Sequence, residues 1–118
     1  MRPVEGKATP AVERVDNGYE ADARVLDHLA RLGCDPSIPR ETRHFLYLPS
    51  RGGANAIARA LEADGWSTSV DRSEAAWLVT ATSARTLTPE LVRETRARLA
   101  ALASEHGGLY DGWEASTA

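Results

Sequence analysis

The chain has 118 residues, of which 42% are hydrophobic and 26% charged, and its formal net charge is -3. This length fits one domain, and the composition is typical of a globular protein rather than a disordered chain. No apolar run is long enough to cross a bilayer, and a mildly acidic balance argues against a dedicated nucleic-acid binder. The N-terminus lacks the apolar region of a secretory signal, so we expect a cytoplasmic protein.

The first 16 residues contain Pro3, Gly6 and Pro10, scattered charges and no apolar period. Such a stretch has no hydrophobic face to bury, so residues 1–16 are predicted to form a flexible N-terminal tail. We expect the rest of the chain, residues 17–118, to form a single α+β domain.

A helix is predicted from Asn17 to Gly33. Asp16 or Asn17 can cap its N-terminus by accepting a backbone N–H, and Gly33 suits the left-handed residue that ends many helices. Apolar residues recur between them at helical spacing, and these are Val25, Leu26, Leu29 and Leu32. Because this leucine stripe needs a surface to cover it, we expect the helix to pack against the domain.

The middle of the chain predicts a strand, a helix and a hairpin. Residues 42–48 are rich in β-branched, aromatic and aliphatic side chains, as in a strand buried within a sheet. Residues 53–64 predict a short helix that ends at Gly65. A hairpin follows, with an outer strand at 66–70, a turn at 71–74 and an apolar strand at 75–82.

The last third predicts a helix and a final strand. Thr88 is a suitable N-cap, Pro89 suits the first helical position, and Gly107-Gly108 stops the helix. Residues 109–113 then return as a short strand. From residue 42 onward the order is β-α-β-β-α-β, which is the ferredoxin-like split βαβ plan. This plan has a four-stranded antiparallel sheet with two helices on one face, and here an additional helix precedes it.

The sequence carries no recognisable enzyme signature. Its three histidines lie on different predicted elements, and its one cysteine, Cys34, excludes an internal disulfide and a thiolate-rich zinc site. No GxGxxG, Walker or Ser/His/Asp arrangement is present. We therefore predict no catalytic residue, no metal site and no cofactor. His44 is the one histidine with a candidate binding role, because a central strand either buries it or presents it on the uncovered sheet face.

The aromatic residues are a better guide to binding. Trp66, Trp77 and Trp113 fall on three predicted strands, and Phe45 and Tyr47 fall on the fourth. Because two helices cover only one face of such a sheet, some of these rings can lie on the other face. Exposed aromatic surface commonly binds proteins. The alternative is that the tryptophans pack in the core.

The segment from Gly107 to Glu114 contains Tyr110-Asp111-Gly112-Trp113 and resembles the C-terminal signature of the RraB family, the regulators of ribonuclease E activity. The resemblance covers residues 20–114. It also includes Gly33-Cys34-Asp35-Pro36 after the first helix, His44 on the next strand, Gly65-Trp66 at a helix end, and a threonine-rich link from Thr80 to Thr88.

This resemblance implies a ferredoxin-like domain that inhibits or retunes ribonuclease E by binding the nuclease, without cutting RNA itself. The implied partner is a protein, either an RNase E/G-type ribonuclease or a degradosome component. The best-known members are strongly acidic and carry an acidic tail after the last strand, whereas this chain has a net charge of -3 and stops at Ala118. The resemblance therefore supports the fold more strongly than the partner.

We expect partner binding to involve large or signature side chains of the predicted strands, namely His44, Tyr47, Trp66, Trp77, Tyr110, Asp111, Gly112 and Trp113. Tyr110 and Trp113 lie three residues apart, so a regular strand would point them to opposite faces; a bulge at Gly112 would change this. A structural role for the signature, in fixing the last strand, fits the residues as well as a binding role does.

Two other functions fit the same fold. One is a small-molecule-sensing or dimerisation module, because a fold does not determine function and the uncovered sheet face suits a homo-oligomer. The other is an RNA-binding module, because the split βαβ plan with aromatics on its sheet also serves RNA recognition. The acidic balance and the missing basic aromatic strand motif make direct nucleic-acid binding the weaker of the two.

Overall fold

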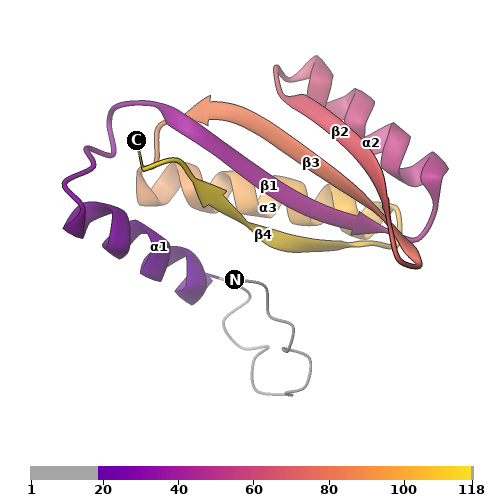
Figure 1. The fold of residues 1–118 in the computed structure, drawn as a ribbon, viewed down its shortest axis with the longest axis horizontal. Helices are drawn as coiled ribbons and strands as arrows, with labels where there is room; N and C mark the ends of the chain where they lie inside the picture. The colour runs from indigo at the N-terminus through magenta and orange to yellow at the C-terminus, as the bar shows by residue number, and fades with distance from the viewer. Residues whose placement is uncertain (1–18, 118) are drawn as a thin grey trace.

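A four-stranded antiparallel sheet with two helices on one face forms the centre of the computed structural model, which describes residues 19–117 (Figure 1). The predicted tail at residues 1–16 lies outside the described residues. The elements in chain order are α1 (Tyr19–Arg31), β1 (Arg40–Leu48), α2 (Arg51–Ala63), β2 (Ser67–Ser73), β3 (Ala76–Arg85), α3 (Pro89–Glu105) and β4 (Leu109–Ala115). The described part of the chain contains no helix that is long and apolar enough to span a membrane.

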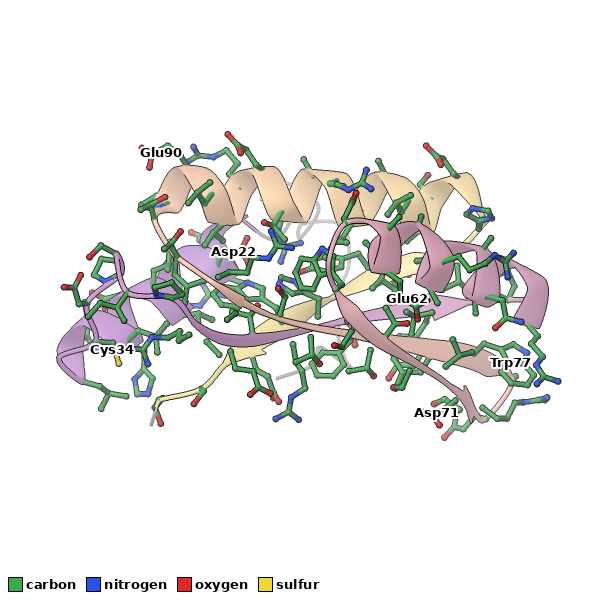
Figure 2. The ribbon with its side chains drawn as sticks, turned by 90° about the horizontal axis from the view of Figure 1, so that it is seen from above. Asp22, Cys34, Glu62, Asp71, Trp77 and Glu90 are labelled. Atoms are coloured by element: carbon green, nitrogen blue, oxygen red, sulfur yellow. The ribbon has the colours of Figure 1, made fainter. Side chains whose placement is uncertain are left out.

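The strand order β2-β3-β1-β4 confirms the predicted α+β fold and its split βαβ topology. The central strand β1 pairs with β3 along its whole length and with β4 on its other side. Helices α2 and α3 lie on one side of this sheet (Figure 2). The face turned away from α2 and α3 carries no helix of the described residues, and we call it the open face.

Strand alternation decides which side chains form the core. On β1, Leu46 and Leu48 are fully buried beneath the helices, so Phe45 and Tyr47 point to the open face. The main core joins these leucines to Ile57 and Leu61 of α2, Val79 of β3 and Leu99 of α3.

Both helices over the sheet begin with the side-chain caps that their sequences favour. The Ser50 side chain accepts a hydrogen bond from the backbone N–H of Gly53 at 3.0 Å. Thr88 does the same for Leu91 at 3.3 Å, and Pro89 occupies the first turn, as predicted. These caps set the residues at which α2 begins after β1 and α3 begins after β3.

The hairpin differs from the prediction in its turn. The predicted turn at 71–74 is wrong, because β2 continues through Ser73 and pairs with Ala76, which leaves only Glu74 and Ala75 as the connection. Glu74 adopts φ 56°, the left-handed conformation that tight hairpin turns require. The polar residues of this stretch belong to an edge strand exposed to solvent. Trp66 lies one residue before β2 rather than on it.

Helix α1 packs beside the sheet instead of on it, next to β4 in Figure 1. Its Leu29 joins Leu87 and Val92 in a second, smaller apolar cluster at the start of α3. Val25, Leu26 and Trp113 pack against that cluster. Three residues of the predicted stripe, Val25, Leu26 and Leu29, thus find the covering surface that the sequence led us to expect, whereas Leu32 is 53% exposed.

Candidate functional site

A bulge in β4 turns both aromatic residues of the Tyr110–Trp113 segment to the helix side of the sheet. Tyr110 pairs with Leu46 and Trp113 pairs with His44, and the register shifts between these two pairs. Two residues of β4, Asp111 and Gly112, therefore oppose one residue of β1. Gly112 has φ 96°, which favours glycine at this position. The sequence alone did not decide whether β4 has a bulge at Gly112, and the structure shows that it does.

On the helix side of the sheet, a cluster of aromatic rings surrounds a buried pair of side chains, His44 and Tyr110. The His44 side chain is 5% exposed, and its Nδ1 lies 2.8 Å from the hydroxyl oxygen of Tyr110. The Trp66 ring meets the His44 ring edge-on, with 5.2 Å between centroids, and the Trp113 ring stacks on it at 5.9 Å. His44 is thus enclosed by aromatic rings and has one polar partner among its described contacts.

Burial holds both members of this pair neutral. Burial, together with the positive charges of Arg85 and Arg96, lowers the pKa of His44 from 6.5 to about 3. Burial also raises the pKa of the Tyr110 hydroxyl above its ordinary value. A neutral imidazole and a neutral phenol form an uncharged hydrogen bond in the core.

A second polar group ties α1 to the rest of the molecule. Asp22 of α1 is a buried residue, and its carboxylate accepts two hydrogen bonds from the Arg96 guanidinium of α3, at 2.6 and 2.8 Å. The Trp113 indole N–H of β4 donates to the same carboxylate at 2.7 Å. One side chain of α1 therefore joins three elements that are far apart in the sequence.

Arginines stack on the aromatic rings of this cluster. The Arg96 guanidinium lies 4.8 Å from the centroid of the Tyr110 ring, and Arg85 lies 4.1 Å from that of Trp66. Such cation–π contacts stabilise a desolvated guanidinium. Arg96 thus links the Asp22 carboxylate to the His44–Tyr110 pair through one continuous set of contacts, which we call the buried network.

The pKa shift of His44 predicts a stability that falls in acid. In the unfolded chain the His44 imidazole takes up a proton below about pH 6.5, whereas in the folded chain it takes up that proton only near pH 3. The stabilisation is therefore fully present above pH 6.5 and is lost as the pH falls towards 3. We expect the free energy of unfolding to drop by about 2 kcal/mol between pH 7 and pH 5 from this group alone. Urea unfolding of the wild type and of His44→Gln at several pH values measures this drop in the free energy of unfolding.

The control for this measurement is His28→Gln, which changes an exposed histidine on α1. The His44→Gln protein should lose most of the drop between pH 7 and pH 5, whereas His28→Gln should keep it. A His44→Gln protein whose stability falls as steeply as that of the wild type would show that His44 does not titrate in this way.

The open face presents a row of large apolar side chains across three strands. The register places Tyr47 of β1 between Leu78 of β3 and Leu109 of β4. Leu109 is 63% exposed, and Tyr47 and Leu78 are half-buried. Asp71 of β2 follows Leu78 in the same row and is seen on the side of the sheet away from α2 and α3 in Figure 2. We call Leu78, Tyr47 and Leu109 the apolar row.

The residues that were predicted to bind a partner therefore lie in different parts of the molecule. His44, Trp66, Tyr110 and Trp113 meet in the interior, where they support the fold; a contribution to partner binding stays a prediction for them. Tyr47 lies in the apolar row. Asp111 and Gly112 line a hollow of about 210 Å³ at the β4 edge. Trp77 lies at the hairpin end of the sheet, on the helix side, with Arg51 and Arg72 against its ring.

Sequence reasoning missed Asp22 and Arg96, the charged pair at the centre of the buried network. A signal for Asp22 is present in the sequence. It lies three, four and seven residues before Val25, Leu26 and Leu29, so it shares their helical stripe. An acidic residue on the apolar stripe of a helix indicates a buried carboxylate that needs a cationic partner. Among the described residues, no three His, Cys, Asp or Glu side chains gather closely enough to hold a metal ion.

A comparison with known protein families finds a match to this chain. A family model described as "Regulator of ribonuclease activity B" matches residues 19–115. The matched range begins with α1 and ends with β4, so it includes every helix and strand of the described residues and the whole buried network. No match was found among curated proteins.

Proposed function

The chain belongs to the RraB family, the regulators of ribonuclease activity, and from this membership we propose that it binds an RNase E/G-type ribonuclease. It regulates RNA decay in the cytoplasm by occupying a surface of the nuclease or of its degradosome, and it does not cut RNA itself. The observation that carries this proposal is the family match over the complete fold, from the first residue of α1 to the last residue of β4.

The geometry supports a binding role over a catalytic one. The titratable pair His44 and Tyr110 is enclosed by rings and held neutral, so it is placed to support the fold rather than to exchange protons with a substrate. The apolar row, in contrast, is presented to solvent on a sheet face that no described helix covers. A few side chains near the centre of an interface contribute most of the binding energy, and Tyr is enriched among them.

We assign the apolar row as the contact surface for the nuclease. Its three members come from neighbouring strands of a rigid sheet, so their relative positions are fixed before binding. A preformed surface loses little side-chain and backbone entropy when it binds, which favours affinity. Tyr47, one of the residues singled out from the sequence, lies at the middle of this row.

Substitution of the apolar row tests this assignment. We expect Tyr47→Ser and Leu109→Gln each to weaken binding to a purified RNase E-type nuclease by about tenfold or more, since each removes apolar contact area. Leu32→Gln is the matched control, because Leu32 is an exposed leucine outside the sheet, 53% exposed after α1. Surface-immobilised nuclease gives the dissociation constants. Equal affinity of all three variants and the wild type would exclude the row as the contact surface.

A further inference from the structure

Two arginines meet one tryptophan ring at the hairpin end of the sheet. Arg72 of β2 pairs directly across from Trp77 of β3, and its guanidinium carbon lies 5.2 Å from the centroid of the Trp77 ring. Arg51, the first residue of α2, lies 5.5 Å from the same centroid. Both arginines are exposed and Trp77 is half-buried. Figure 2 shows Trp77 at the end of the sheet, near the hairpin.

The charge of these two guanidinium groups is not balanced by an ion pair with a described carboxylate. Arg31, Arg43, Arg96 and Arg98, by comparison, each pair with an Asp or Glu. The backbone carbonyl of Glu74 accepts a hydrogen bond from Nε of Arg72 at 2.9 Å, which orients the guanidinium without neutralising it. The first turn of α2 contains no acidic residue, so the positive end of its dipole adds to the charge of Arg51.

This arrangement favours anion binding. Each guanidinium carries a charge that no described carboxylate balances, and an oxyanion that accepts hydrogen bonds from it would offset that charge. Guanidinium groups present planar, paired donors that match a carboxylate, and stacking on Trp77 leaves their edges available for those bonds. The ring itself supplies apolar contact for the stem of an acidic side chain.

We propose that Arg51, Arg72 and Trp77 form a docking surface for an acidic segment of a protein partner, in which Asp or Glu carboxylates pair with the two arginines. A protein segment fits this surface better than RNA does. Nucleic-acid binding uses an extended basic stripe, whereas this positive surface is local, has Asp71 and Glu74 beside it in the sequence, and belongs to a chain with a net charge of -3. The surface is distinct from the apolar row, and the proposal holds whichever protein carries the acidic segment.

Titration with a decaglutamate peptide at low ionic strength tests this proposal directly on the full chain. We expect saturable binding, detected by calorimetry and by a change in tryptophan fluorescence. Arg51→Gln combined with Arg72→Gln should weaken it by about tenfold or more, because both carboxylate-binding groups are lost. The matched control combines Arg59→Gln with Arg93→Gln, which removes the same charge from two exposed arginines elsewhere, and it should bind like the wild type. Melting temperatures establish that each variant is folded.

A second pair of variants separates this site from general attraction between opposite charges. Arg51→Lys with Arg72→Lys keeps the charge but loses the paired donors, so its affinity should fall between those of the wild type and the glutamine variant. Three results would overturn the proposal: no saturable binding of decaglutamate, equal weakening by the control pair, or tighter binding of a single-stranded RNA decamer than of the peptide through the same two arginines.

Discussion

Asp22→Ala is expected to lower the free energy of unfolding by about 3 to 5 kcal/mol. The carboxylate makes two hydrogen bonds to Arg96 and one to Trp113, and the side chains of the ion pair are only 6% and 13% exposed. Its removal takes away the bidentate partner of a mostly buried guanidinium and the acceptor of a partly buried indole N–H. Denaturant unfolding followed by circular dichroism measures the loss.

Asp27→Ala is the matched control for this substitution. Asp27 lies on the same helix and also pairs with an arginine, Arg31, but both side chains are more than half exposed. Its loss should change stability by no more than about 0.5 kcal/mol. If Asp22→Ala costs as little as Asp27→Ala, then the buried network does not hold α1 in place. Faster amide exchange confined to α1 in the Asp22→Ala protein would further support that role.

Gly108→Ala is expected to destabilise the fold by about 3 kcal/mol, because the added methyl group has no space. A Cβ at this position would lie 2.3 Å from the carbonyl oxygen of Tyr47 and 2.5 Å from Cδ1 of Leu48. The carbonyl belongs to β1, the central strand, which is paired on both sides and has little freedom to move. The clash would push β4 away from β1 at the point where the signature segment begins.

The control is Gly52→Ala in the first turn of α2, where an added Cβ meets no atom within 4 Å. Alanine favours a helix more than glycine does, so this variant should be as stable as the wild type or slightly more so. Thermal unfolding of the two variants in parallel makes the comparison. A Gly108→Ala protein that melts at the same temperature as Gly52→Ala would mean that the close approach of residue 108 to β1 is not required.

The order of the elements could be predicted from the sequence because its signals are local. Gly33, Gly65 and Gly107 follow helices and have positive φ angles, and Thr88-Pro89 begins one. The turn at 71–74 was predicted wrongly because polar residues are typical both of turns and of an exposed edge strand. Only the pairing of Ser73 with Ala76 distinguishes the two, and that pairing depends on the partner strand.

The candidate site was less predictable because its contacts are long-range. Asp22 and Arg96 are separated by 74 positions, and the sequence around each residue does not indicate that the other is its partner. The orientation of Tyr110 and Trp113 depends on a bulge whose presence shows only in the register with β1. Tyr47, by contrast, follows from strand alternation as soon as the buried side of β1 is known. The Tyr110–Trp113 segment thus identifies the family from sequence, while its chemistry becomes clear only in the folded chain.

The central claim, regulation of a ribonuclease by protein binding, is tested most directly by the rate of RNA cleavage. A purified RNase E-type nuclease cuts a fluorescent RNA while this chain is added in increasing concentration, alone and as the Leu109→Gln and Leu32→Gln variants. We predict a saturable change in cleavage rate with the wild type and with Leu32→Gln, shifted to higher concentration for Leu109→Gln. A cleavage rate that stays constant at every concentration of the wild-type chain, or RNA cleavage by the chain without the nuclease, would contradict the claim.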